Sequence, residues 1–245
     1  MPRYKLFIEY DGTDFVGWQR QENGLGVQQC VEEAIHAFCD EKVTVFASGR
    51  TDAGVHALEQ VAHFDLPKDV EPETIRDALN FHLKPAPIAV LSASVAANDF
   101  HSRFSARERH YLYRIINRRA PVTVDSGRVW WVPTPLDAAA MHAAAAVLKG
   151  RHDFTSFRAA ECQAKSPVKT LDKLEISRNG NEILVSAKAR SFLHHQVRNI
   201  VGTLKLVGED KWSTEDVHRA LIARDRAAAG PTAPACGLYL AKVVY

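Results

Sequence analysis

The sequence predicts an α+β protein built from two related halves. Strand-like and helix-like segments follow one another as strand, helix, strand, strand, helix, strand over the first 96 residues, which is the pattern of a ferredoxin-like domain. Similar elements recur from His110 onward. No Pro/Gly/Ser linker separates the halves, so we expect two ferredoxin-like (RRM-like) units, residues 1–105 and 106–245, whose mostly antiparallel sheets abut around a central active-site cleft.

The first half is expected to contain two amphipathic helices, because apolar residues recur there every three or four positions. These helices should span residues 27–39 and 73–83. The predicted strands lie at residues 5–10, 43–47, 61–66 and 89–96.

The second half carries two local signals that fix its elements. Asn179-Gly180 is a strong turn sequence and predicts a hairpin that joins residues 171–177 to 182–188. Ser213, followed by Asp216 at capping-box spacing, predicts the start of a short helix. The remaining elements are helices at 137–149 and 192–207 and strands at 110–117, 127–132 and 238–245.

The composition is typical of a globular protein, with 46% hydrophobic and 24% charged residues and a formal net charge of +2. The N-terminus lacks the apolar stretch of a signal peptide, and no run approaches the roughly 18 apolar residues of a membrane span. We therefore expect a cytoplasmic protein without membrane contact. The four cysteines form no CxxC pair, which argues against a zinc ribbon and a disulfide framework.

Asp52 is the principal candidate for a catalytic group. It lies between two glycines in the segment 49–57, Gly-Arg-Thr-Asp-Ala-Gly-Val-His-Ala, on a loop between two predicted strands. The glycines allow close approach of backbone or substrate, and Arg50 is near enough to favour the ionised carboxylate. The same residue types also occur in an ordinary connecting loop.

The segment 101–119 is strongly basic and contains aromatic residues, with Glu108 as its one acid. Such a mixture suits a surface that holds an RNA backbone and stacks its bases. The alternative is the solvated edge of a sheet. Its arginines are Arg103, Arg107, Arg109, Arg114, Arg118 and Arg119, of which we expect the first three to contact substrate.

The segment 49–57 resembles the active-site signature of the TruA family of pseudouridine synthases, which isomerise uridine to pseudouridine in tRNA. The resemblance extends over nearly the whole chain. Two positions depart from the family pattern: Ser102 and Gln196 stand where alanine and methionine are more usual. The other matching segments are 10–19, 100–106, 153–157, 194–202 and 237–240.

The resemblance implies the pseudouridine synthase fold, a tRNA substrate, a homodimer and no cofactor. It also implies that the modified uridines are those at tRNA positions 38, 39 and 40, in the anticodon stem-loop. Asp52 matches the catalytic carboxylate of the family. It could act as a nucleophile toward the sugar or the base, or as a base that removes a sugar proton, and the sequence does not decide between these roles.

Two arginines are assigned to Asp52 by the same resemblance. Arg50 would form an ion pair with it and help to displace the target base. Arg198, on the helix predicted at 192–207, would pair with the carboxylate, although an arginine on a helix is more often a solvated charge.

The resemblance also implies residues that hold the flipped base. Tyr111 matches the tyrosine that stacks on it, and Leu238 would pack under the uracil. Tyr111 could instead be a core residue of its strand, and Tyr113 competes for the stacking role because it points to the same face.

Two other functions compete with this interpretation. A non-catalytic RNA-binding module would share the basic and aromatic surface but has no need for the Asp52 loop. A metal-dependent hydrolase could use His56 and His63 or the adjacent His194 and His195. Neighbouring residues on a helix point about 100° apart, so we expect no metal site there.

Overall fold

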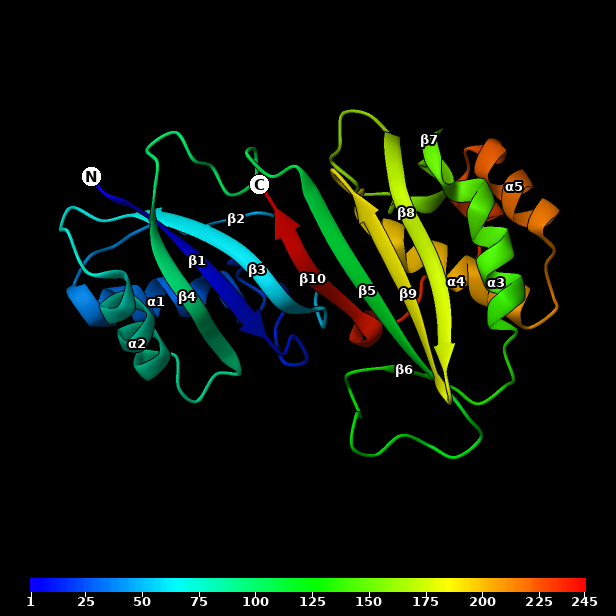
Figure 1. Ribbon diagram of the computed structural model, residues 1–245, viewed down its shortest axis with the longest axis horizontal. Coiled ribbons are helices and arrows are strands. Elements are labelled where there is room, and N and C mark those ends of the chain that lie inside the picture. The colour runs from blue at the N-terminus through cyan, green and yellow to red at the C-terminus, as the bar shows by residue number, and fades with distance from the viewer. The chain divides into compact units, whose positions relative to one another are not determined.

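The structure is a computed structural model that describes all residues from 1 to 245. It consists of two compact units (Figure 1). The first comprises Met1–Arg107 and Tyr239–Tyr245, and the second comprises Glu108–Leu238. The last strand was expected in the second half, but its residues from Tyr239 onward belong to the first unit. They do so because Tyr239 and Leu240 pair with β3 of that unit.

The sheet of the first unit has the strand order expected for a ferredoxin-like domain. β1 (Arg3–Tyr10) lies between β4 (Ile88–Ala96) and β3 (His56–Asp65), antiparallel to both. The free edge of β3 is shared by two strands. β2 (Phe46–Ala47) pairs with its second half in the antiparallel sense, and β10 (Leu238–Val244) runs parallel to its first residues.

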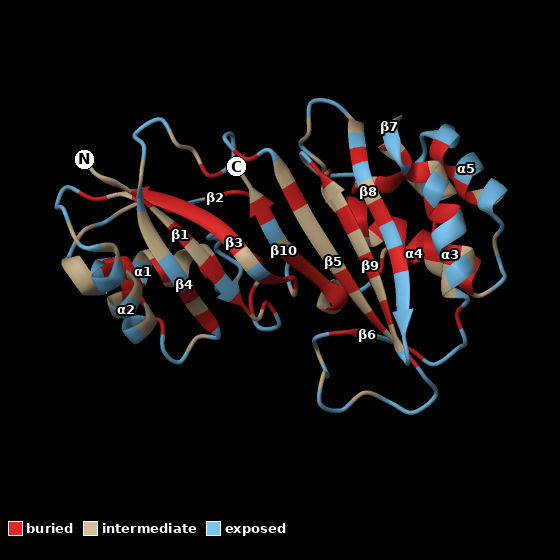
Figure 2. Ribbon diagram, viewed as in Figure 1, coloured by how far each residue is buried: buried red, intermediate tan, exposed pale blue.

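Two helices complete the core of the first unit. α1 (Val27–Cys39) and α2 (Pro72–His82) span the ranges predicted from their apolar spacing to within one residue. Alternate residues of β1, such as Leu6 and Ile8, are completely buried, as are the inward-facing residues of both helices. Figure 2 shows buried positions alternating with mostly intermediate ones along β1.

The strand predicted at 43–47 is shorter than expected, since only Phe46 and Ala47 join the sheet. The reason lies in the backbone of Val45. Its amide donates to the Glu32 carboxylate and its carbonyl accepts from the Gln28 side chain. Side chains of α1 therefore replace the strand partner at this position.

The second unit has the strand order β5-β9-β8-β7. β8 (Val168–Asn179) and β9 (Glu182–Ala189) form a hairpin around the predicted Asn-Gly turn, and β9 also pairs with β5 (Glu108–Asn117) in the antiparallel sense. β6 (Trp130–Val132) pairs with β5 in the parallel sense. β7 (Gly150–Asp153) was not predicted, because its four residues contain no apolar side chain.

One capping prediction for the helices of the second unit is confirmed, and two of these helices begin or end at residues other than those predicted. α5 (Thr214–Ala223) begins after Ser213, and the capping box with Asp216 is formed. α3 (Ala138–Ala145) ends four residues early and continues as a 3-10 turn, η1 (Ala146–Leu148), before the chain turns into β7.

α4 (Gln196–Gly208) starts four residues later than predicted. Leu193 and Gln196 close a turn instead, and His195 adopts a left-handed conformation with φ of 61°. The predicted α+β class with mostly antiparallel strands is confirmed. The abutting sheets and the central cleft stay predictions. None of the helices has the length and apolar character that a membrane span requires.

Candidate active site

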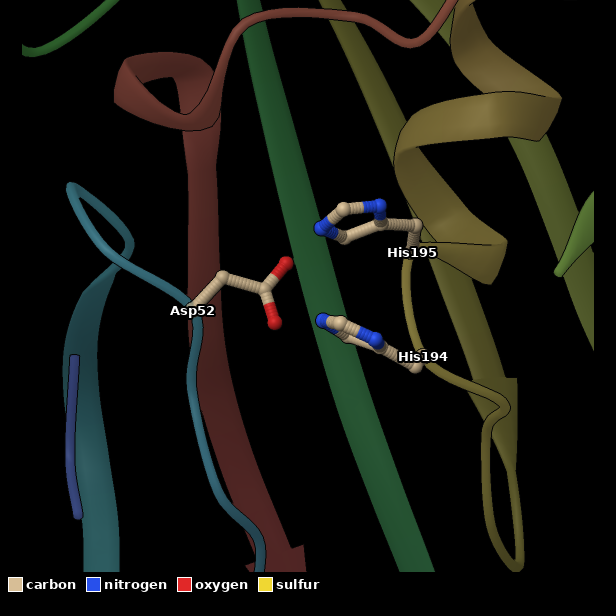
Figure 3. A group of neighbouring side chains, drawn as sticks. All are labelled: Asp52, His194 and His195. Carbon is tan, nitrogen blue, oxygen red and sulfur yellow. The ribbon is translucent and has the colours of Figure 1, made fainter. Parts of the chain in front are cut away.

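Asp52 lies on the loop that leads from β2 into β3. Its side chain is half-buried, and Figure 3 shows the carboxylate projecting from the loop. The loop pairs with the N-terminal segment through an isolated bridge between Asp52 and Gly17. The position of the carboxylate is therefore tied to residues far away in the sequence.

Residues that follow β1 hold the backbone of this loop. The Trp18 amide donates to the carbonyl of Thr51 at 3.1 Å, and the amide of Gly54 donates to the Phe15 carbonyl at 3.3 Å. The Tyr10 hydroxyl shares a buried hydrogen bond of 2.8 Å with the hydroxyl of Thr51. Bonds on both sides of Asp52 thus limit the freedom of its backbone.

Gly17 lets the two segments meet. Its φ of 111° is a conformation that other residues rarely adopt. A Cβ atom at this position would lie 2.6 Å from the Thr51 carbonyl oxygen and 3.1 Å from the Asp52 carbonyl carbon. Glycine is required here both for its conformation and for the space beside the Asp52 backbone.

The two ends of the loop are fixed by polar residues of β3. Gln60 is completely buried, and its amide group accepts from the Ser48 hydroxyl and donates to the Gly49 carbonyl, each at 2.7 Å. At the other end, His56 Nδ1 accepts from the Gly12 amide at 3.0 Å. The loop is consequently a rigid platform for one carboxylate.

Arg50 lies two residues before Asp52 on the same loop. The Arg50 side chain is exposed to solvent. Its assignment as the partner of Asp52 therefore stays a prediction.

The structure separates the two tyrosines that competed for the stacking role. Tyr113 is completely buried, and its hydroxyl donates to the Pro234 carbonyl at 2.7 Å. Burial raises the pKa of this hydroxyl. Tyr111 is only partly buried, and its ring meets that of Phe192 edge-on with centroids 5.0 Å apart. Of the two, only Tyr111 is partly exposed to solvent.

Arg198 and Leu238 lie in the second unit. Arg198 is in the first turn of α4, and its Nε donates to the Ala233 carbonyl at 2.8 Å. Leu238 is buried at the start of β10, directly after the 3-10 turn η4 (Ala235–Gly237). Their predicted contacts with Asp52 and with the uracil stay predictions.

The basic segment contains arginines of two kinds. Arg103 and Arg107 are exposed and remain candidates for contact with RNA. Arg109 is only 8% exposed, and its guanidinium donates to the Arg190 carbonyl. The predicted contact of Arg109 with substrate stays a prediction.

The two adjacent histidines differ from the sequence-based expectation. His194 and His195 precede α4 and are not helical, so their rings do not diverge by the helical angle. The ring centroids are 4.0 Å apart. Figure 3 shows both side chains on the segment ahead of α4. His194 Nδ1 lies 3.6 Å from the Glu161 carboxylate.

Sequence reasoning missed the residues that position the Asp52 loop, above all Tyr10, Gly17 and Gln60. The glycines of the segment 10–19 were the available signal. They could not show which distant backbone the segment approaches.

Comparison with known proteins identifies the family. A model described as tRNA pseudouridine synthase matches residues 6–105 and 144–245. The chain belongs to the tRNA pseudouridine synthase family. Three relatives, each named tRNA pseudouridine synthase A, align with the whole chain. The relative from Paramagnetospirillum magneticum is 61% identical over 96% of its length, and those from Rhodospirillum centenum and Parvibaculum lavamentivorans are 62% and 58% identical over their full lengths.

The predicted pseudouridine synthase fold is confirmed by this family match. Within the family pattern, the two unusual residues each form a buried hydrogen bond. The Ser102 hydroxyl donates to the Phe46 carbonyl at 2.7 Å and also meets His63 Nδ1 at 2.9 Å. Gln196 accepts from the Leu193 amide at 2.8 Å. Both side chains therefore hold neighbouring backbone groups.

Proposed function

We propose that this chain isomerises uridine to pseudouridine in tRNA, with Asp52 as the catalytic carboxylate. The observation that carries the proposal is the construction of the Asp52 loop. Hydrogen bonds of Tyr10 and Gln60 hold the first part of the loop, and the bond from the Gly12 amide to His56 holds its far end, while its carboxylate stays half-exposed. Catalytic groups need such a rigid support with an accessible reactive atom. The loop lies inside the segment that matches the family.

The reaction exchanges one bond of the nucleotide for another. The bond between N1 of uracil and C1′ of ribose breaks, the uracil turns, and a bond from C5 to C1′ forms. The proton on C5 leaves and N1 gains a proton, so the product is an isomer and no electrons are gained or lost. A single carboxylate suits this chemistry, either as a nucleophile or as a base.

The target uridine must leave its stack before the carboxylate can act, which costs a few kcal/mol. Tyr111 is our candidate for the residue that stacks on the flipped base, and Leu238 for the residue beneath it. Arg50 would help to displace the base, and Arg198 would keep the carboxylate ionised.

The tRNA backbone would be held by Arg103 and Arg107, whose side chains are exposed in the first unit. By the family resemblance, we further propose that the substrate uridines are at tRNA positions 38, 39 and 40. We also propose that the enzyme works as a homodimer in the cytoplasm.

Release of tritium from tRNA labelled at C5 of uridine tests this proposal directly. We expect release by the wild-type protein in the presence of EDTA and none by Asp52→Asn, which removes the charge with little change in shape. Asp14→Asn is the matched control. Asp14 is an exposed acid in the segment that holds the Asp52 loop, and its variant should release tritium normally.

Binding of tRNA, measured in parallel, separates the competing functions. Asp52→Asn should bind tRNA nearly as well as the wild type. If neither protein releases tritium while both bind tRNA, the chain is an RNA-binding module. If EDTA abolishes release by the wild type, the cofactor-free mechanism is wrong.

A further inference from the structure

An exposed ring cluster lies in the first unit, formed by Phe46, His101 and Phe104. The His101 ring joins the two phenylalanines, with centroids 5.8 Å from Phe46 and 4.4 Å from Phe104. Phe46 is 47% exposed and Phe104 is 71% exposed. Large apolar side chains are rarely exposed side by side unless the surface binds something.

The ring cluster is built on a fixed base. Ser102, completely buried beneath it, bonds to the Phe46 carbonyl and to His63. The buried His63 ring lies against both Phe46 and His101, with centroids 5.2 and 4.7 Å away. The exposed rings are thus supported from below, which lowers the entropy lost when a ligand stacks on them.

The charge beside the ring cluster is positive. The Arg103 guanidinium lies 5.8 Å from the centre of the Phe104 ring, within the range of a cation–π contact. Burial and the nearby Arg3 lower the pKa of His101, which favours the uncharged form of its ring. Flat aromatic surfaces beside a guanidinium match the two parts of a nucleotide, its base and its phosphate.

The register of β3 places the ring cluster away from the Asp52 loop. Phe46 pairs with His63, whereas the Asp52 loop enters β3 at His56. Seven residues of extended strand separate these points, or roughly 20 Å at about 3.3 Å per residue. A flipped uridine at Asp52 therefore cannot also occupy the ring cluster.

We propose that the ring cluster binds a second, unpaired nucleotide of the RNA substrate, with its base on Phe46 or Phe104 and its phosphate near Arg103. The inference rests on the proposed function, since it assigns a second contact on the same RNA. It extends that function by requiring an unpaired nucleotide some 20 Å from the target uridine.

Phe104→Ala and Phe46→Ala test this site, with Phe81→Ala as the matched control. Phe81 lies on α2 and is 69% exposed, almost as much as Phe104. We expect each cluster variant to raise KM for tRNA about 5- to 150-fold with little change in kcat, the range typical of losing one stacked base. Phe81→Ala should leave KM unchanged. Phe104→Trp should restore affinity, and its fluorescence should fall when single-stranded oligouridylate binds.

Direct binding separates this inference from the proposed function. Affinity for single-stranded oligouridylate requires no turnover, so it should decrease in Phe104→Ala even if the wild type releases no tritium. Wild-type affinity in both alanine variants would overturn the inference. It would also be overturned if either variant changed the sedimentation coefficient of the free protein, because the ring cluster would then join two copies of the chain.

Discussion

Gly17→Ala should uncouple the Asp52 loop from its support while leaving the two units folded. The added Cβ would lie 2.6 Å from the Thr51 carbonyl oxygen, whereas ordinary contacts of this kind begin at 3.4 Å. The difference of 0.8 Å must be taken up by movement of the backbone that carries Asp52. Gly17 also has a φ of 111°, which alanine rarely adopts.

The strained backbone conformation should reduce stability, and the displaced Asp52 backbone should reduce activity. The backbone conformation should cost about 1–3 kcal/mol of folding free energy, which lowers Tm by roughly 2–4 °C per kcal/mol in a chain of this size. Displacing a catalytic group by about 1 Å can reduce the rate by about 100-fold. We therefore expect a fall of tens of fold in kcat/KM with a modest fall in Tm.

Gly180→Ala is the control for the backbone effect. Gly180 also has a positive φ, 56°, but a Cβ there would meet nothing within 4 Å. Tm from thermal unfolding and kcat/KM from tritium release should be measured for both variants. Gly180→Ala should lower Tm without lowering kcat/KM. Equal activity in the two variants would refute the argument that Gly17 positions Asp52.

Two further predictions concern RNA binding and pH. Arg107→Ala should weaken tRNA binding and reduce the slope of log K against log salt by about 1, as measured by titrations at several salt concentrations. An unchanged slope would mean that Arg107 touches no phosphate. Burial, followed by the charges of His101 and Arg3, lowers the pKa of His63 from 6.5 to about 4. As the pH falls, His63 is therefore protonated in the unfolded chain before it is protonated in the folded one. The stability that is present above pH 6.5 should be lost progressively as the pH falls to about 4. The free energy of unfolding of His63→Gln, measured by chemical denaturation, should decline less over this pH range than that of the wild type. An identical decline would show that His63 does not cause the pH dependence.

Local sequence signals predicted the elements that depend on local physics. The apolar spacing of α1 located both of its ends, and Ser213 with Asp216 located the start of α5. Predictions failed where distant residues decide the outcome. The side chains of Gln28 and Glu32 shorten β2, and no pattern near residue 45 carries that information.

The same contrast between local signals and distant contacts applies to the candidate site. Asp52 could be found from its glycine-flanked motif and from the family resemblance. The supports of its loop could not, because Tyr10 and Gln60 contact it only after β1 and β3 have paired. The solvent exposure of a side chain could not be predicted from the sequence either. Arg107 and Arg109 look alike in the sequence, but Arg107 is exposed and Arg109 is buried.

The pairing of β10 with β3 has a consequence for biosynthesis. Residues 239–245 belong to the unit that begins at Met1, so the first unit lacks a strand until the ribosome has made these residues as well as the whole second unit. Protein domains commonly fold in order as they emerge, but this one must wait for its last residues. Until then part of the edge of β3 stays open to pairing with other chains. A nonsense mutation shortly before codon 239 would therefore damage the unit that begins at Met1.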